Sequence, residues 1–592
     1  MALGVHFVHT SGHRAPVFER SRLASLSRAL AWSAPEGAAA AATAKGTSAR
    51  DWPLYAATMR MLLALVGSLL LASCAPHDSF NVWPQAAGPH ANWIAPEARV
   101  ATAWSVARGE NILWKCALPN AGQGGIAVVG DRIYLTTFAE QDPAKPRQSN
   151  VILCHAIDRA TGALVWSREL RADHGRTSPQ MYAFSDSTSW SPIASHARVW
   201  FFNSSGSMVC FTRDGEEVWR REFRTQPEAY PFNRQCEPIA VGEYLVTIEP
   251  IAKDHPRHDA ARDDWNYLHA VDRATGNVAW ISEDSCTFYC TPVLGPHGIL
   301  IGRGGPHDVP ERPIGLSMID PANGRRVWAF EPSGELGSDG GWEALYALHS
   351  DERYAYWFRN GREQSHLVLD ARTGALVREQ SLSGKVDMTR ASGERLVDVE
   401  LAALADPAFP PAAGESLHVH PQWHTTIVAN GWHWFLCTTN NRRNGLAPAG
   451  HSGPAFSLGR VHVETGDVEF LELPVGVAVD GTRLYGKPLR TNTVDARGVE
   501  IADEDRSRTD GWEIDAFFPT PVVLGSHLYI TTMLGTVYVV DAHAPVLDTR
   551  ALVAVNDLGP LGDCWSMSGP SAAGGVLYHR NARELVAIRA AK

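Results

Sequence analysis

From about residue 108 to its end, the chain consists of short runs in which apolar and polar residues alternate, which predicts β-strands. One pair of runs is GIAVVGDRIYLTTF (125–138), with Gly130 and Asp131 at a tight turn between them. Similar pairs recur as SPIASHARVWFFNSSG, EPIAVGEYLVTIEP, TPVLGPHGILIGRGG, TTIVANGWHWFLCTTN and PTPVVLGSHLYITTMLG. The pattern therefore predicts a series of antiparallel hairpins.

A second kind of hairpin follows these pairs. Its clearest copies are HAIDRATGALVW (155–166) and HAVDRATGNVAW (269–280), each a strand ending at Asp, an Ala-Thr-Gly turn and a strand with Trp. Gly supplies the positive φ that a tight turn needs, and the Asp and Thr side chains can hydrogen-bond the turn backbone. Looser copies cover residues 208–223, 317–332, 367–382, 460–473 and 538–558.

Two hairpins make a four-stranded unit, and a spacing of about 50 residues between units is typical of β-propeller blades. A lone unit would leave both faces of its sheet exposed, so the units must stack around an axis. NILWKCALP (111–119) has no strands before it, so we expect it to complete the last blade and close the ring. We therefore expect an all-β fold with eight blades of four antiparallel strands; seven blades is the alternative. The expected blades are 121–170, 189–223, 235–283, 288–332, 342–382, 422–473, 516–558, and 566–592 together with 108–119.

Two stretches, 383–421 and 474–515, interrupt this rhythm and carry clusters of charge. Both are much longer than a blade connection, and loops of that length are usually functional or disordered.

The N-terminal region has a different character. MRMLLALVGSLLLASC (59–74) has a basic start, an apolar run too short to span a membrane, and a Leu-Ala-Ser-Cys end, which predicts a signal peptide. The ending resembles a bacterial lipobox, which implies lipidation of Cys74 and, with Ala75 next, sorting to the outer membrane. The alternative is plain secretion. Residues 1–58 are then a disordered extension or a mis-assigned start, 75–107 a linker and 108–592 the propeller.

Composition limits the partners. The chain has 592 residues, a net charge of -11 and 45% hydrophobic residues, which is ordinary for a globular protein without a basic footprint for nucleic acid. The 20 Trp residues suggest a repeated packing position, and the 51 Gly and 37 Pro suit many strands joined by turns. Eight of the nine Cys lie after Cys74, and Cys286 with Cys290 is the one plausible local pair; buried free thiols are the alternative.

With its repeat written as AxDxxTGxxxW, the chain resembles the PQQ-like eight-bladed propeller superfamily from about Trp83 to its end. That superfamily includes quinoprotein alcohol dehydrogenases and the lipoprotein of the outer-membrane β-barrel assembly machinery. The segment WPQAAGPHANW (83–93) looks like a branch of exported proteins named only for these repeats. Quinone-dependent members stack PQQ on a vicinal Cys-Cys disulfide, and this chain has no Cys-Cys dipeptide, so none of their cofactor residues carries over and no cofactor is expected.

The innermost strand of each blade should line the central channel, so side chains just before the recurring Pro residues are expected at one channel mouth. Polar and aromatic side chains that converge there would form a ligand pocket. The alternative is that they fill the tapering channel. The candidates are Trp190, Gln235, Tyr289, Trp342, Glu343, Trp423, His424 and Phe518.

The densest group of His residues is His418, His420 and His424. Alternate residues of a strand point to one face, so His418 and His420 could ligate a metal together, with His424 close by. The alternative is a solvated polar loop edge, which is also the simpler interpretation of the charged run KDHPRHDAARDD (253–264).

The sequence thus favours an exported, lipid-anchored propeller that binds or scaffolds other envelope proteins and is not an enzyme. It would face the periplasm from the outer membrane or lie at the cell surface, touch the membrane only through its anchor, and be a monomer because a closed ring leaves no free edges. The alternative is a ligand-binding or catalytic propeller, quinone-dependent or active on carbohydrate, with its site at the channel mouth.

Overall fold

The computed structural model describes residues 81–590 except 141, 147, 175–176, 180–185, 226–235, 264, 288–290, 305–312, 334–347, 360–364, 383, 401–419, 439–455, 475, 485–494, 499–518 and 561–563. The described residues belong to one compact unit. The predicted extension, signal peptide and Cys74 lie outside the described residues.

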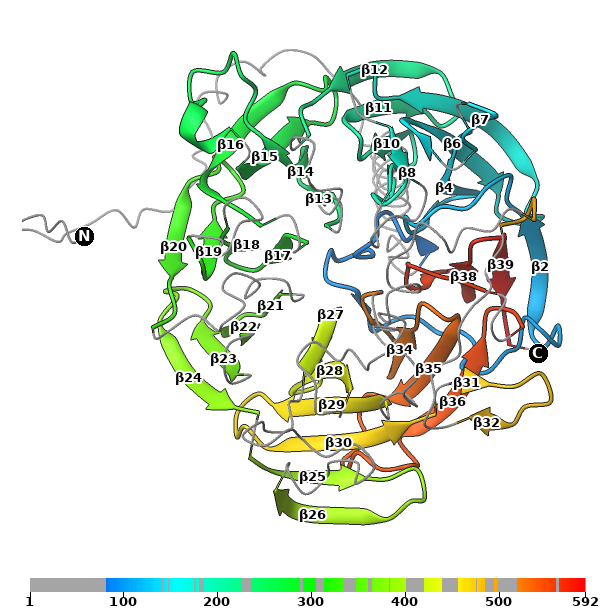
Figure 1. Ribbon diagram of the computed structural model, residues 1–592, viewed down its shortest axis with the longest axis vertical. Helices are drawn as coiled ribbons and strands as arrows, with labels where there is room; N and C mark the ends of the chain where they lie inside the picture. The colour runs from blue at the N-terminus through cyan, green and yellow to red at the C-terminus, as the bar shows by residue number, and fades with distance from the viewer. Residues whose placement is uncertain are drawn as a thin grey trace, which may run out of the picture. The chain divides into compact units, whose positions relative to one another are not determined.

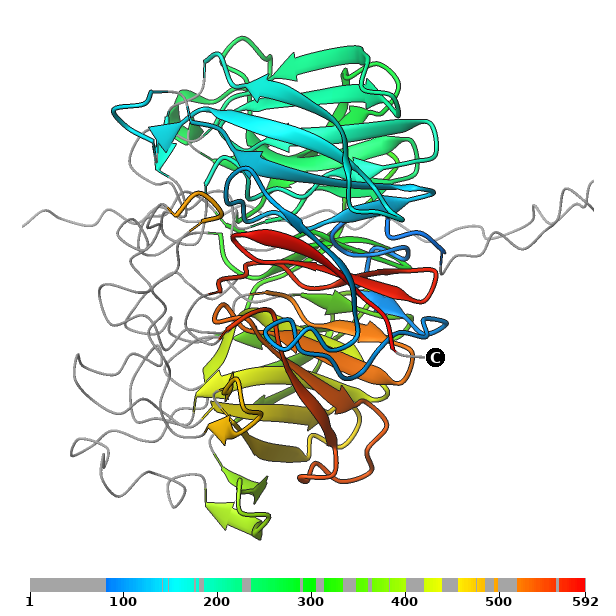
Figure 2. The same cartoon turned by 90° about the vertical axis from the view of Figure 1, so that its right-hand side faces the viewer.

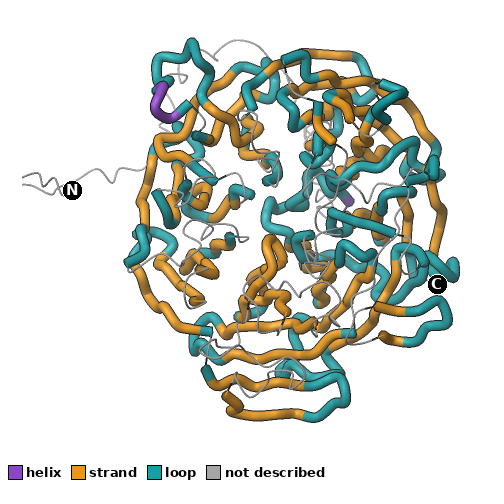
Figure 3. The backbone as a smooth tube through the Cα atoms, viewed as in Figure 1, coloured by secondary structure: helices purple, strands orange, loops and turns teal. Residues whose placement is uncertain are grey.

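The compact unit is an eight-bladed β-propeller, as predicted (Figure 1). Nearly all regular structure in the described ranges is strand, and Figure 3 shows these strands arranged around a central axis. Blade 1 consists of β3 (Ala127–Val129), β4 (Arg132–Phe138), β6 (Val151–Asp158) and β7 (Leu164–Arg171), and blade 2 of β9 (Ile193–Ala194), β10 (Arg198–Asn203), β11 (Ser207–Thr212) and β12 (Glu217–Glu222). Blade 3 consists of β13 (Ile239–Val241), β14 (Tyr244–Pro250), β15 (Asn266–Asp272) and β16 (Val278–Ser285), and blade 4 of β17 (Val293–Gly295), β18 (Gly298–Gly302), β19 (Leu316–Ile319) and β20 (Arg326–Phe330).

Blades 5 to 8 follow in chain order. Blade 5 consists of β21 (His349–Ser350), β22 (Tyr354–Arg359), β23 (Ser365–Asp370) and β24 (Leu376–Ser381), and blade 6 of β27 (His420–Ala429), β28 (Trp432–Thr438), β29 (Phe456–His462) and β30 (Val468–Leu473). Blade 7 consists of β33 (Val522–Leu524), β34 (His527–Thr531), β35 (Thr536–Asp541) and β36 (Leu552–Asp557), and blade 8 of β37 (Ser571–Ala573), β38 (Val576–Arg580) and β39 (Glu584–Ile588) with β2 (Ile112–Ala117). Two short pairs lie outside the blades: β5 (Gln148–Ser149) with β8 (Ser178–Pro179), and β31 (Gly476–Val477) with β32 (Arg483–Leu484).

The ring closes where the first and last strands of the propeller meet. β2 is the outermost strand of blade 8 and runs antiparallel to β39, with Trp114 opposite Ala587 and Cys116 opposite Leu585. This pairing confirms the predicted closure. It leaves the last strand, β39, paired on both sides within blade 8.

The recurring Asp-x-x-Thr-Gly sequence shapes the outer turn of a blade. Oδ1 of Asp158 accepts hydrogen bonds from the N–H groups of Ala160 and Thr161 and from the Thr161 hydroxyl, at 2.8–3.1 Å. Gly162 follows with φ of 74°, a left-handed conformation that favours Gly. Asp272 and Asp370 form the same bonds in blades 3 and 5.

In five blades the Gly of the turn also receives the Trp of the preceding blade. A Cβ on Gly276 would lie 2.7 Å from Cε3 of Trp219, so only Gly leaves room for the indole. Trp219 Nε1 in turn donates to the carbonyl of Arg273, 3.2 Å away in the same turn. The repeat therefore encodes the contact between blades as well as the turn. The same stacking joins Trp114 to Gly162, Trp166 to Gly215, Trp280 to Gly324 and Trp328 to Gly374.

The segment expected to be a linker, 75–107, belongs to the folded unit from Asn81 onward. Trp83 exchanges backbone hydrogen bonds of 2.7 and 2.8 Å with Val128 of β3, and β1 (Ile94–Ala95) adds in parallel to β33. Further along, Ser105 and the N–H of Ala107 bond the carboxylate of Asp557 at 2.5 and 2.8 Å. Inner strands expose unpaired backbone groups, and this segment pairs with them.

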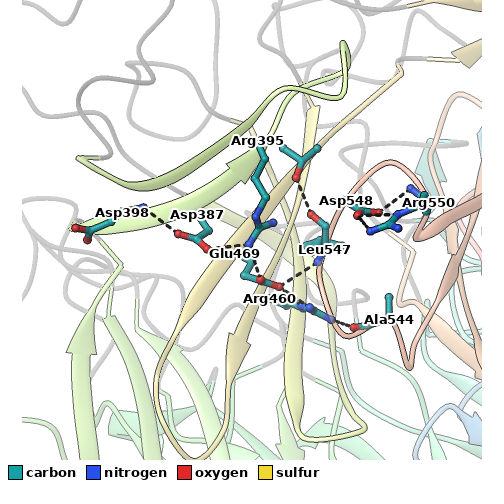
Figure 4. Close-up of polar contacts among 10 residues, drawn as sticks. Asp387, Arg395, Asp398, Arg460, Glu469, Ala544, Leu547, Asp548 and Arg550 are labelled. Carbon is teal, nitrogen blue, oxygen red and sulfur yellow. Dashed lines mark hydrogen bonds and ion pairs between the residues drawn. The ribbon is translucent and has the colours of Figure 1, made fainter.

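Blade 6 carries two additional strands that the sequence pattern did not predict. β25 (Lys385–Thr389) pairs in parallel with β30, and β26 (Arg395–Glu400) pairs with β25, so the sheet has six strands. Both come from the first of the long interruptions. Figure 4 shows the polar contacts that hold them.

A buried ion pair lies at the centre of these contacts. Arg460, with 0% of its side chain exposed, bonds Glu469 and the carbonyl of Ala544, and stacks on Trp432 with its guanidinium carbon 3.9 Å from the ring centre. Glu469 also pairs with Arg395 of β26 at 3.2 Å (Figure 4). The pair thus links the additional hairpin, blade 6 and the turn of blade 7 that contains Ala544.

The described residues of the second long interruption (474, 476–484 and 495–498, here called the strap) contact blades 7 and 1. β31 lies beside β36 of blade 7, and Arg497 bonds Asn120 at 3.1 Å and Glu140 at 3.0 Å, which stand before β3 and after β4 of blade 1. In Figure 2, β31 and β32 of this strap lie on the side of the ring opposite to β1 and the other blue N-terminal residues. The strap and the N-terminal segment therefore lie on opposite faces.

Candidate functional site

The residues that begin the innermost strands surround a cavity on the propeller axis. Those of five blades stand directly before Pro, which restricts the preceding residue to extended backbone and starts each strand in the same way. They are Ser191, Glu237, Thr291, Thr520 and Gly569, and all of them line the cavity.

Hydrogen bonds join four neighbouring blades at this level. The N–H of Gly125 donates to Oγ of Ser191 at 2.6 Å, and Ser191 donates its N–H and hydroxyl to the two oxygens of Glu237, both at 2.8 Å. The N–H of Glu237 then donates to Oγ1 of Thr291 at 3.0 Å. The result is a polar belt from blade 1 to blade 4 that fixes the Glu237 carboxylate at the axis.

The carboxyl group of Glu237 titrates near neutrality. Burial raises its pKa to about 7, and the two hydrogen bonds from Ser191 oppose that rise without cancelling it. A carboxyl group with such a pKa can either donate or accept a proton at physiological pH.

The cavity also contains polar atoms without partners. Nε2 of Gln123 and Oγ of Ser568 are buried, and neither has a hydrogen-bond partner among the described residues. Oε1 of Gln123 is occupied by the hydroxyl of Ser189 at 3.1 Å. The unpaired atoms could therefore bond ordered water or a small polar group.

The space on the axis is small. Ala86 and Trp93 of the N-terminal segment form part of its wall, and its volume is about 80 Å³. Ligand pockets typically measure about 300–1,000 Å³. The described part of this cavity therefore has room for water or a small polar group.

The predicted channel-mouth residues fall into three groups. Trp190 is 2% exposed and stacks on Phe223 inside the ring, with ring centres 5.7 Å apart, and it is not among the residues that line the cavity. Trp423 and His424 lie in a part of β27 of which the structure describes only the backbone. Gln235, Tyr289, Trp342, Glu343 and Phe518 lie outside the described residues, so their role stays a prediction.

The signal that identifies the observed cavity residues is the residue immediately before each Pro. The prediction favoured larger side chains one or two positions earlier, whereas Ser191 and Glu237 provide the contacts on the axis. Gln123 was missed because blade 1 has Gly-Ile at 125–126 where those five blades have a residue and Pro.

No metal site emerges from the residues that the structure describes, since no group of three His, Cys, Asp or Glu is arranged to hold an ion. His418 lies outside them and His420 is described only as the first residue of β27, so the predicted His418, His420 and His424 site stays a prediction. In the charged loop, His258 bonds Asp263 at 2.7 Å, and Asp259 caps the short helix η2 (Ala260–Arg262).

Six of the seven described Cys residues are buried. Burial raises the pKa of the Cys154, Cys236 and Cys437 thiols, so these groups stay protonated near neutral pH. Cys290 lies outside the described residues, so its pairing with Cys286 stays a prediction.

Two larger grooves lie outside the cavity on the axis. One of about 710 Å³ lies between blades 2 and 3 and is lined by charged residues, among them Arg221, Arg224 and Asp263. The other, of about 1,000 Å³, lies beside the N-terminal segment and blades 5 to 7. Both are wide enough for a peptide segment of another protein.

Residues 96–253 and 147–282 match the sequence model of a family described as outer membrane protein assembly factor BamB. Comparison by sequence with curated proteins gives no significant match. None of the described helices is both long enough and apolar enough to cross a membrane.

Solved structures that are similar to this one share little of its sequence. A quinohemoprotein alcohol dehydrogenase from Comamonas testosteroni is 12% identical over 88% of this chain and 82% of that chain, with a TM-score of 0.48. A europium-containing methanol dehydrogenase is 12% identical over 86% and 89%, with a TM-score of 0.43. BamB from Moraxella catarrhalis is 12% identical over 83% and 96%, with a TM-score of 0.33. In its repeat sequence and in its ring of eight blades, the chain is similar to the PQQ-like β-propeller proteins.

Proposed function

We propose that this protein is a protein-binding or scaffold module of the cell envelope. The observation that carries the proposal is where the open space lies. The described axis holds only about 80 Å³, whereas the two grooves on the blades measure about 710 and 1,000 Å³. The described axial cavity is thus too small for a drug-sized ligand, whereas the two grooves have room for a segment of a partner protein.

The family match supports a place in the envelope, because the matched family is described as an outer membrane assembly factor. Together with the predicted signal peptide, it leads us to propose export and lipidation at Cys74. The protein would then be anchored to the outer membrane by its acyl chains and would present the propeller to an envelope protein.

The experiment is co-purification from envelope extract after crosslinking in cells. We expect a defined envelope protein in a fixed ratio to the propeller, together with a Cys74→Ala variant that leaves the membrane fraction. A membrane-associated protein that crosslinks to no partner would contradict the scaffold role, and a Cys74→Ala variant that stays in the membrane fraction would contradict lipid anchoring.

A second function rests on the polar belt at the axis. The Glu237 carboxyl group, with its pKa near 7, and the unpaired Gln123 and Ser568 atoms could bind a small polar ligand or take part in catalysis. Calorimetric titration with small sugars, and with PQQ and Ca²⁺, tests this function. Binding that a Glu237→Gln variant loses would favour it, and no heat with any of these ligands would count against it.

A further inference from the structure

The inner strand of a blade has a middle residue whose backbone groups point toward the axis. In β3 this residue is Val128: its neighbours pair with β4, and its own N–H and C=O bond Trp83 of the N-terminal segment. The same segment therefore acts as an additional strand along the inner edge. At the equivalent inner edges, the N–H groups of Ala194, Ala240 and Val523 donate hydrogen bonds to this segment. Their acceptors are, in that order, the carbonyl of Pro84, Oε1 of Gln85 and the carbonyl of Trp93.

Blade 6 presents the same edge without such a partner. Ala429 and Trp432 close a two-residue turn at Asn430 and Gly431, which have φ of 53° and 79°. Val428 is therefore the middle residue, with its backbone groups facing the axis as in Val128. Among the residues that the structure describes, none pairs with this edge of Val428.

Val428 lies in the groove of about 1,000 Å³. Its lining includes the apolar side chains of Ile94 and Val100 from the N-terminal segment, and those of Tyr356 and Val463 from blades 5 and 6. Tyr356 and Val463 form a small buried cluster against which Val428 packs. The groove thus offers an apolar surface next to an open strand edge.

The charges around the groove have one predominant sign. Arg99 and Arg589 are exposed in its lining, and neither forms an ion pair with a described carboxylate. The one carboxylate of the lining, Asp351, already accepts the hydroxyl of Tyr356 at 2.7 Å and the N–H of Arg353 at 2.8 Å. The Arg99 guanidinium donates to the carbonyls of Pro96 and Ala98 at 3.0 and 2.8 Å, so its charge is not neutralised by these contacts. An incoming chain with carboxylates would therefore meet two positive charges without a described counter-ion.

We propose that this groove binds an extended, acidic segment of a partner protein, which adds as a strand to the inner edge of β27. The segment would bond the backbone of Val428 as β1 bonds β33, place apolar side chains on Tyr356 and Val463, and direct carboxylates toward Arg99 and Arg589. This inference rests on the proposed protein-binding function and names the surface and the chemistry of its partner.

The test uses two labelled nine-residue peptides, one alternating valine with glutamate and the other valine with lysine. We expect the glutamate peptide to raise fluorescence anisotropy at concentrations at least tenfold lower than the lysine peptide. A Val428→Pro variant removes the edge N–H, and the double variant Arg99→Glu with Arg589→Glu reverses the charge of the rim. Each should weaken binding of the glutamate peptide at least tenfold.

Leu294→Pro is the matched control, because Leu294 is the middle residue of β17 in blade 4 and does not line the groove. Equal binding of both peptides, or full binding to the double charge variant, would overturn the proposal even if Val428→Pro fails to fold. A crosslinked envelope partner that the double charge variant retains would also overturn it, while leaving the scaffold function standing. Peptide binding without any envelope partner would leave the groove standing and remove the scaffold function.

Discussion

At the scale of single residues, the interior of the propeller contains buried groups whose pKa values lie outside their usual range. Histidines in five blades are buried and bonded to neutral partners, such as His155 to Thr137 and His579 to Thr531, both at 2.9 Å. Burial lowers the pKa of His155, His349 and His579 to about 4. Glu237 shows the opposite shift, so the two kinds of group respond to pH with opposite signs.

The histidines predict a loss of stability in acid. Because their folded pKa lies below the unfolded value of about 6.5, the unfolded chain takes up protons first as the pH falls. Each buried histidine with a pKa of about 4 then withdraws about 2–3 kcal/mol of stability between pH 6.5 and 4. Denaturant midpoints should fall over this window, and less steeply in a His155→Gln and His579→Gln double variant. Parallel curves for both proteins would contradict this.

The carboxyl group of Glu237 predicts the opposite change of stability with pH. Its folded pKa of about 7 exceeds the unfolded value, so its contribution is fully present below pH 4.5 and is lost as the pH rises through 7. A Glu237→Gln variant should therefore gain about 1–3 kcal/mol over the wild type at pH 8 and little at pH 5. Glu243→Gln, on the exposed turn after β13, is the control in the same thermal unfolding experiment. An equal gain at both pH values would refute the assignment.

At the scale of elements, the turn and the contact between blades are encoded by the same residues. The Gly of the Asp-x-x-Thr-Gly turn has positive φ and also lies under the Trp of the preceding blade, as Gly276 lies under Trp219. Blade 5 departs from the pattern: Arg378 stands in the Trp position and donates to the carbonyl of Glu464 in the next turn. Gln380 covers Gly466 there and bonds its carbonyl at 2.6 Å. Polar groups therefore maintain the contact between blades 5 and 6.

Substitution of this Gly separates its role in the positive-φ turn from its role in the contact with Trp. Gly276→Ala meets both the positive φ of 79° and the Trp219 ring at 2.7 Å, whereas Gly242→Ala meets a positive φ of 55° and no atom within 4 Å. We expect about 1–2 kcal/mol of destabilisation for Gly242→Ala and about 1–3 kcal/mol more for Gly276→Ala. Chemical denaturation measures both. Equal losses would mean that the indole contact contributes nothing.

At the scale of the whole molecule, residues before the first blade hold several blades at once. Asp557 of blade 7 bonds Ser105, the N–H of Ala107 and the N–H of Gly559, and its carbonyl accepts Trp104 Nε1 at 3.1 Å. The same segment then continues into β2, which closes blade 8. Closure of the ring thus combines the β2–β39 pairing with this anchor on blade 7.

Removal of the anchor should loosen the closure without unfolding the blades. Asp557→Ala leaves the N–H of Ala107 and the Ser105 hydroxyl without their acceptor, which costs about 2–4 kcal/mol. Hydrogen exchange should then rise in residues 104–117 more than in β14 and β15 of blade 3. Asp557→Asn keeps an acceptor and should lose less. Uniform exchange over the ring would contradict a local role.

The sequence by itself determined the strand repeat, the eight blades and the closing strand, because alternation, turn chemistry and Trp spacing are local and recur in every unit. Only the tertiary structure decided that residues 83–95 pair with inner edges, and that β25 and β26 extend blade 6, because neither segment follows the repeat. The cavity residues were likewise decided in three dimensions. Ser191 and Glu237 lie 46 positions apart, and their contact exists only because neighbouring blades start at the same level on the axis.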